Sequence, residues 1–218
     1  YGFTGDGIII SGGSGGTLTA YNIDGKEIAS FTGHTGSILS IAVDGDRLVS
    51  GSNDQTVRVW NLKELKSGKQ KIHPVVSIFV SADNEWVVWN NKGFYNASPA
   101  GDRFVGWHFN HGYDYSAGFY SASQFRRYLY RPDIIDRTLD LGSGELAFDE
   151  FLAREPGLKN NNVAELVMRA PVDVWIESVN LRKDGYADIN IRLGSNNTTA
   201  PERITIYING AQLLTQNQ

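Results

Sequence analysis

A segment near the start of the chain is repeated, and this repeat limits what the chain can fold into. Residues 9–22 align with residues 48–61, and Tyr21 aligns with Trp60. The period is therefore 60 − 21 = 39 residues. A period of this length indicates one supersecondary unit per copy, with each unit covering the apolar face of its neighbour.

The second copy has the pattern of a four-stranded unit. Alternating or β-branched residues bounded by Asp-Gly and Asn-Asp turns indicate short antiparallel strands. The predicted strands are residues 26–31, which belong to the preceding unit, and 37–43, 47–52 and 56–60. A four-stranded blade of a β-propeller takes about 40–45 residues, so the period favours propeller blades.

Residues 33–34 and 50–61 together resemble a WD40 repeat over about one whole blade. In that family a His, a strand Ser or Thr, a turn Asp and a Trp form a hydrogen-bond network that locks the blade. The resemblance assigns these roles to His34, Ser50 (or Ser52), Asp54 and Trp60. Such a network is physically reasonable, because a buried imidazole and a buried indole N–H both need partners.

The chain departs from the family pattern at three positions. Asn61 stands where the Trp-Asp pair of the family has its Asp. In the first copy Gly15 replaces the turn Asp and Tyr21 replaces the Trp, so this blade is expected to lack the full network. An acid/base role for His34 and Asp54 is the alternative, but no nucleophile accompanies them.

The next segment combines a charged stretch with a β-meander. Residues 62–71 carry four lysines and are predicted to be a solvated loop between blades, with a basic patch for an acidic partner as the alternative. Residues 75–95 read as three short strands and are compatible with another blade of altered sequence.

Residues 75–140 carry a second resemblance, through motifs such as Glu85–Trp89, Gly93–Pro99 and Tyr130–Asp133. They resemble the segment that follows the propeller in bacterial WD40 proteins with a caspase-like peptidase domain. The resemblance implies a peptidase parent whose catalytic domain lies outside this chain. The chemistry of these residues by itself assigns them no role.

Helical and strand patterns fill the remainder of the chain. Residues 123–130, 133–139 and 145–154 are predicted helices, with Pro132 in a first turn. Residues 172–177, 187–193 and 204–208 alternate like strands and resemble the opening of an Ig-like sandwich, which needs about seven strands. We therefore expect a mainly β chain with a partial propeller at 1–110, a mixed helical segment at 111–160 and a truncated Ig-like domain at 161–218.

Several chemical groups could suggest a catalytic or metal site. His108, His111 and Asp114 are candidate metal ligands, but their spacing does not make them converge. The acidic residues Glu145, Asp149 and Glu150 could be paired carboxylates, but a solvated helix face is favoured. We expect neither a cofactor nor a metal.

The bulk properties limit the possible partners. The formal net charge of −4 gives no indication of nucleic-acid or membrane binding, and the lack of Cys excludes a cysteine nucleophile and disulfides within the chain. Absence of Cys fits the cytoplasmic location that we expect, although it does not forbid secretion. The chain begins at Tyr1 and its only Met is Met168, so we expect the native N-terminus to be missing.

These patterns predict a non-catalytic interaction scaffold or sensor module of a larger WD40 protein. The alternative functions are the regulatory part of a caspase-like peptidase and an independent hydrolase with a β core, which would need a convergent carboxylate or His cluster. Two or three blades leave open edges, so the expected partners are other proteins or further blades, and self-association through blade edges is predicted for the isolated chain.

Overall fold

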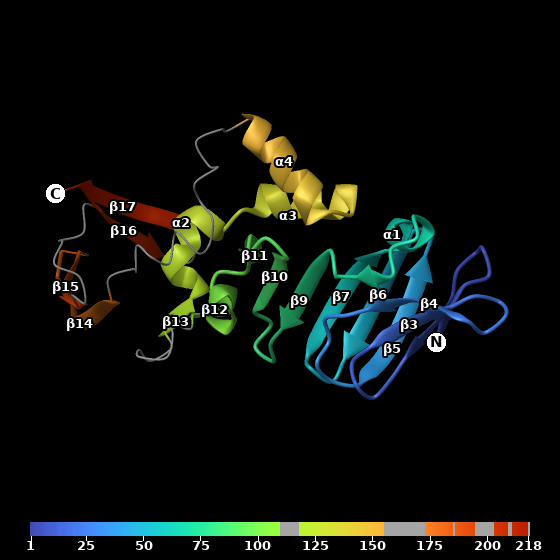
Figure 1. Ribbon diagram of the computed structural model, residues 1–218. Helices are drawn as coiled ribbons and strands as arrows, with labels where there is room; N and C mark the ends of the chain where they lie inside the picture. The colour runs from blue at the N-terminus through green and yellow to red at the C-terminus, as the bar shows by residue number, and fades with distance from the viewer. Residues whose placement is uncertain (110–117, 155–172, 185, 195–202, 209–210, 218) are drawn as a thin grey trace, which may run out of the picture. The chain divides into compact units, whose positions relative to one another are not determined.

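The computed structural model describes residues 1–109, 118–154, 173–184, 186–194, 203–208 and 211–217 (Figure 1). The chain divides into two compact units, residues 1–161 and residues 162–218. The helices in these described ranges are too short or too polar to cross a membrane.

The first copy of the repeat forms a five-stranded sheet in the order β1-β2-β3-β4-β8. Its strands are β1 (Gly2–Phe3), β2 (Ile9–Gly12), β3 (Leu18–Tyr21), β4 (Glu27–Phe31) and β8 (Lys71–Ile72). Neighbours pair antiparallel, except that β8 lies parallel to β4 at the outer edge. The first blade is thus a meander of four strands to which a later segment adds a fifth.

The second copy forms a six-stranded sheet in the order β5-β6-β7-β9-β10-β11. Its strands are β5 (Ile38–Asp44), β6 (Arg47–Ser52), β7 (Thr56–Asn61), β9 (Val76–Val80), β10 (Trp86–Asn90) and β11 (Tyr95–Ala97). β9 pairs antiparallel with β7, which is the blade's own third strand. The interpretation of residues 75–95 as another blade is therefore wrong, because this meander extends the second sheet outward.

The main core lies between the two sheets. Fully buried apolar side chains from both sheets and from the segment after β7 meet there, and they include Ile10, Leu18, Phe31, Leu48, Trp60, Leu62 and Ile72. Gly12 allows the sheets to approach closely, since a Cβ at this position would lie 2.6 Å from the Ile38 Cγ2 atom. Burial of these side chains stabilises the blade pair by the hydrophobic effect, and neither sheet could cover this face alone.

A short helix, α1 (Leu62–Lys66), begins directly after β7. The Asn61 side chain caps it by accepting a hydrogen bond from the Lys63 N–H at 2.9 Å. Leu62 and Leu65 of α1 are buried, so the prediction of a solvated loop over residues 62–71 is wrong at its first turn. The sequence spacing of these two leucines, three residues apart, is that of one helical face.

The helical segment packs on the outer strands of the second sheet. It comprises the 3-10 turns η1 (Gly101–Phe104) and η2 (Ala122–Phe125) and the helices α2 (Arg126–Leu129), α3 (Pro132–Leu141) and α4 (Gly144–Arg154). Ile134 and Ile135 of α3 are buried, and Thr138 accepts a hydrogen bond from the Asn90 side chain of β10 at 3.2 Å. The three predicted helices are confirmed, with Pro132 in the first turn of α3.

Three β-hairpins complete the described ranges. β12 (Gly106–Phe109) pairs with β13 (Gly118–Ser121) in the first unit. In the second unit β14 (Asp173–Leu181) pairs with β15 (Ala187–Gly194), and β16 (Arg203–Ile208) pairs with β17 (Ala211–Asn217). The three predicted strands are present, but two separate hairpins do not confirm an Ig-like sandwich.

Asn61 also connects the second blade to the end of α3. Its Nδ2 donates to the Gly142 carbonyl oxygen at 3.0 Å, and the Arg47 guanidinium donates to the Leu139 carbonyl oxygen at 3.1 Å. Gly142 ends the helix in the left-handed conformation with φ of 65°. The carbonyl groups at this helix end need donors, and Asn61 can supply one where the Asp of the family pattern could not.

We predict that Asn61→Asp loosens α3 from the second blade. The carboxylate keeps the cap on Lys63 but loses the donor to Gly142 and adds negative charge at a helix C-terminus, for an expected cost of about 1–2 kcal/mol. Hydrogen exchange should accelerate in α3 and not in β2 or β3, with exposed Asn53→Asp as the control. Unchanged protection of α3 would contradict this role.

Candidate functional site

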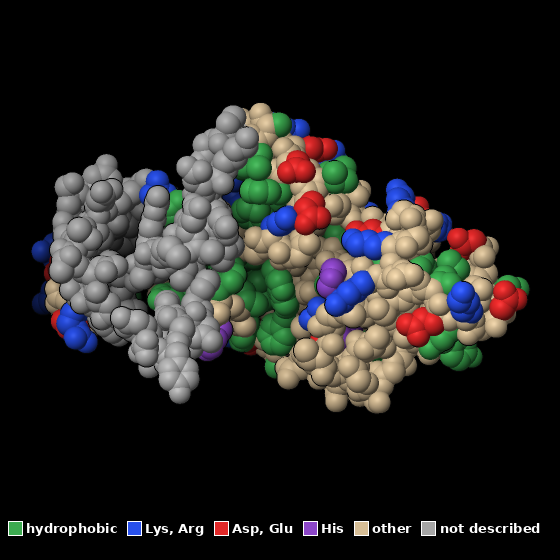
Figure 2. Space-filling view, in the orientation of Figure 1, with side chains coloured by type: hydrophobic (Ala, Val, Ile, Leu, Met, Phe, Trp, Pro, Cys, Tyr) green, Lys and Arg blue, Asp and Glu red, His purple; other side chains and the backbone are tan. Residues whose placement is uncertain are grey.

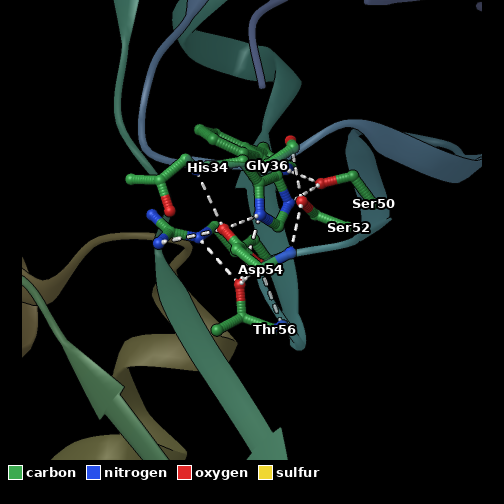
Figure 3. A network of polar contacts seen from close by, with 9 residues as sticks. His34, Gly36, Ser50, Ser52, Asp54 and Thr56 are labelled. Carbon is green, nitrogen blue, oxygen red and sulfur yellow. Dashed lines mark hydrogen bonds and ion pairs between the residues drawn. The ribbon is translucent and has the colours of Figure 1, made fainter. Parts of the chain in front are cut away.

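The predicted network residues meet inside the second blade (Figure 3). His34 comes from the loop between β4 and β5 and is 6% exposed. Its Nδ1 lies 2.9 Å from Asp54 Oδ2, and its Nε2 lies 2.8 Å from Ser50 Oγ. The Trp60 indole N–H donates to the same Ser50 Oγ at 2.8 Å. The structure therefore brings together His34, Ser50, Asp54 and Trp60.

Hydrogen bonding assigns one tautomer to His34. The carboxylate of Asp54 accepts hydrogen bonds, so the ring proton belongs on Nδ1. Nε2 then accepts from the Ser50 hydroxyl, which itself accepts from Trp60. The polar atoms form one continuous chain from indole to carboxylate, and each buried donor has an acceptor.

Asp54 anchors the network at the turn between β6 and β7. Its Oδ1 accepts from the Thr56 backbone N–H at 2.9 Å and from the Thr56 hydroxyl at 2.6 Å, and its Oδ2 accepts from the Thr35 N–H at 3.0 Å. Burial opposes the charged form, but these hydrogen bonds and the one from His34 prevail and hold the pKa of Asp54 far below its usual value. Asp54 is thus a half-buried carboxylate that stays ionised.

Ser52, the alternative to Ser50, has a different position. Its hydroxyl donates to the Gly36 carbonyl oxygen at 2.9 Å and accepts from the Asp54 N–H at 3.2 Å. It therefore braces the loop beside the network and does not contact the imidazole. Thr35 and Thr56 were missed from the sequence, although a Thr two residues after a turn Asp is a recognisable turn signal.

The order Ser50–His34–Asp54 matches that of a hydrolase triad, but the surroundings rule out that role. Ser50 is fully buried, and its oxygen already accepts the Trp60 N–H. A nucleophile must reach a substrate carbonyl, and a nucleophilic oxygen in a closed core cannot do so. The geometry therefore favours a structural role for this group over an acid/base role.

The first blade lacks the matching side chains. Gly15 and Tyr21 occupy the positions of Asp54 and Trp60 in the repeat. Gly16 adopts φ of 80°, and a Cβ there would lie 2.5 Å from the His34 carbonyl oxygen. This turn therefore accommodates the backbone of the His34 loop and offers it no carboxylate.

The other candidate groups form no cluster among the residues that the structure describes. His108 is exposed on β12, whereas His111 and Asp114 lie outside the described residues. Glu145 pairs with Lys92 at 2.9 Å and Glu150 with Arg137 at 2.7 Å, so these α4 carboxylates face cations on the surface. Across the described part of the chain, no cluster of three or more His, Asp or Glu side chains could hold a metal ion.

The lysines after β7 are partly neutralised. Lys66 lies 2.7 Å from Asp46, and Lys69 lies 2.7 Å from Glu64. Figure 2 shows basic and acidic side chains interspersed on the visible face of the first unit. The visible face therefore carries both signs of charge.

Comparison with known proteins agrees with the blade geometry. Residues 25–61 match the family model described as "WD domain, G-beta repeat". These residues therefore match a WD40 repeat. They run from the turn before β4 to the end of β7, and so include all four predicted network residues.

Similar proteins include the ribosome biogenesis protein YTM1 of several fungi. The Eremothecium gossypii protein is 34% identical over 94 residues, which is 34% of this chain and 21% of that protein. The Kluyveromyces lactis protein is 35% identical over 96 residues, which is 36% of this chain and 22% of that protein. The chain thus spans about a fifth of the length of these relatives.

Among solved structures, the WD40 β-propeller domain of Doa1 matches 44% of this chain and 33% of its own, with 17% identity and a TM-score of 0.27. A TM-score this low carries no argument, so the propeller assignment stands on the repeat and on the sheets. The relatives are eukaryotic, and they give no support to the expected bacterial origin or caspase-like association.

We predict that Ser50→Ala destabilises the first unit by about 2–3 kcal/mol. The change removes one small oxygen but leaves the Trp60 N–H and the His34 Nε2 buried without partners. Urea unfolding followed by Trp fluorescence measures the loss. Ser40→Ala, at an exposed position on β5, should cost less than about 0.5 kcal/mol; equal effects of the two variants would disprove the network's contribution.

We predict that Asp54 makes the fold acid-sensitive. Its pKa is lower in the folded protein than in the unfolded chain, so its stabilisation is complete above an unfolded value of about 3.9 and is lost as the pH falls further. Urea unfolding should show the free energy of unfolding declining from about pH 4 downward. The Asp54→Asn variant should have a lower free energy of unfolding at neutral pH, and this free energy should fall less steeply below about pH 4. An equally steep fall in the variant would contradict the prediction.

Proposed function

We propose that this chain is a non-catalytic protein-interaction module, in which the second blade presents a rigid surface to a protein partner. The observation that carries the proposal is the WD40 repeat whose polar residues are bonded to one another in the interior. Groups used in this way hold loops in place and are not available for turnover.

The network stiffens one particular surface. It ties the β4–β5 loop to the β6–β7 turn, because Asp54 accepts hydrogen bonds from both. Thr35, Asn53 and Gln55 are exposed on these two segments. A preorganised surface loses little conformational entropy on binding, which favours affinity. We call these three residues the loop surface and propose it as the contact region.

The relatives support an interaction role in general terms. Their name places them in ribosome biogenesis, but the similarity covers about a third of this chain and a fifth of each relative. That coverage supports a protein-binding module and not a particular complex. The alternative, a regulatory part of a caspase-like peptidase, has no support from the relatives and is not proposed; a cytoplasmic location is part of the proposal.

The test is binding of a purified partner to the full chain. Affinity capture with the tagged chain supplies candidates, and calorimetric titration should show saturable binding to one of them. Thr35→Arg and Asn53→Arg on the loop surface should weaken this binding at least about tenfold, whereas Lys183→Glu in the second unit should leave it unchanged. Binding that only Lys183→Glu weakens, or no saturable protein binding, would refute the proposal.

A further inference from the structure

The hairpin formed by β12 and β13 (Figure 1) has one packed face and one exposed face. On the packed face Trp107 is the cross-strand partner of Tyr120. Both rings contact Phe125 of η2, with ring centroids 5.3 Å and 6.1 Å away, and these contacts fix the hairpin to η2. On the exposed face His108 is the cross-strand partner of Phe119, and cross-strand partners project to the same side of a sheet.

The Phe119 ring has a defined position although the residue is 66% exposed. It lies against Gly106 on the partner strand, where a Cβ would be only 2.6 Å from the Phe119 Cζ atom. A glycine allows this close approach, since the side chain of any other residue would displace the ring. His108, on the same face, is also exposed. The hairpin therefore presents two flat rings to solvent, and one of them rests on the backbone of the neighbouring strand.

The turn η1 adds a third ring and a cation beside this hairpin. η1 packs on β13, and its Phe104 is 38% exposed. The guanidinium carbon of Arg103 lies over the Phe104 ring, 4.6 Å from the ring centroid. Arg103 also pairs with Asp83, but both side chains are more than half exposed, so this ion pair contributes little free energy. We call Arg103, Phe104, His108 and Phe119 the aromatic patch.

The size of the aromatic patch favours small planar ligand groups over a protein surface. A fully covered aromatic side chain buries about 150–250 Å², so the exposed parts of the three rings offer on the order of 200–300 Å². A stable protein interface takes about 800 Å² from each partner. Small nucleic-acid-binding modules, in contrast, stack about two or three bases on exposed aromatic rings, and guanidinium planes serve the same purpose. The composition of the patch matches this second kind of ligand.

We propose that the aromatic patch binds single-stranded nucleic acid, with bases stacked on Phe104, His108 and Phe119 and one phosphate at Arg103. Stacking supplies most of the affinity, because the chain has a formal net charge of −4 and the patch contains one arginine and no lysine. A duplex does not fit, since its bases are already paired and stacked on one another. This inference goes beyond the proposed function, because it assigns a second ligand to a surface other than the loop surface.

The test is the fluorescence anisotropy of a labelled oligouridylate of about ten nucleotides, titrated with the full chain. At about 50 mM salt we expect saturable binding with a dissociation constant below about 100 µM. Contact with one phosphate predicts an affinity only about threefold weaker at about 200 mM salt. A G·C duplex of the same length should bind at least about tenfold more weakly. Absence of saturable binding, or equal affinity for the duplex, would overturn the proposal.

Three variants locate the binding on the aromatic patch. Phe119→Ala removes one stacking ring and should weaken oligouridylate binding at least about fivefold, with an unchanged thermal unfolding midpoint because the ring is exposed. Tyr186→Ala, at a 70% exposed position between β14 and β15, is the matched control and should bind normally. Asp83→Asn should strengthen binding about twofold, since it removes the carboxylate that competes with phosphate for Arg103. Equal effects of Phe119→Ala and Tyr186→Ala, or weaker binding by Asp83→Asn, would refute the assignment.

Failure of this proposal can be told from failure of the proposed function. Phe119→Ala leaves Thr35 and Asn53 unchanged, so this variant should still bind the protein partner of the loop surface. If oligouridylate does not bind and Phe119→Ala weakens binding of the protein partner, the aromatic patch belongs to a protein interface and the nucleic-acid proposal is refuted. If oligouridylate binds as expected but no protein partner does, the proposed function is refuted and the nucleic-acid proposal stands.

Discussion

The chain of hydrogen bonds from the buried Trp60 to the half-buried Asp54 is the interaction on which the first unit depends. It joins the buried indole of β7 and the buried imidazole of the loop before β5 to the half-buried, ionised carboxylate of the turn after β6, and a buried polar group left unpaired would be costly. Because every link needs the next, the chain holds the loop before β5 against the turn after β6. The Trp60 ring also packs edge-on against Phe31 of the first sheet, with ring centroids 5.6 Å apart. Trp60 therefore links the hydrogen-bond network of the second blade to the apolar packing between the two blades.

The two copies of the repeat are stabilised by different interactions. The second blade is stabilised by its own internal hydrogen-bond network. The first blade carries Gly15 and Tyr21 at the positions of Asp54 and Trp60, so it cannot form the same network. It is instead stabilised from outside, by close approach at Gly12 and by the buried face that it presents to the second sheet. Such nearest-neighbour dependence is the expected behaviour of repeat proteins.

The meander after the second blade shows how local pattern and tertiary pairing differ. Residues 75–95 form the strands that their alternation predicts, but β9 hydrogen-bonds to β7 instead of starting a new sheet. Strand propensity reports that a segment is extended and does not report which edge it joins. The same limit applies to α1, where burial of Leu65 against the blade pair turned a charged stretch into a helix. The structure also explains why Asn61 departs from the family pattern. Its amide donates a hydrogen bond to the Gly142 carbonyl oxygen at the end of α3, and an Asp could not.

The sequence alone determined the period and the strands of the second blade, whereas the network residues His34, Asp54 and Trp60, with either Ser50 or Ser52, were what the resemblance to a WD40 repeat implied. It could do so because a 39-residue repeat and the alternation of side chains are local properties, written in consecutive residues. Tertiary structure decided which of Ser50 and Ser52 contacts His34, and which sheet receives β9. These depend on distances between residues far apart in the chain, and such distances follow from packing and not from any local pattern.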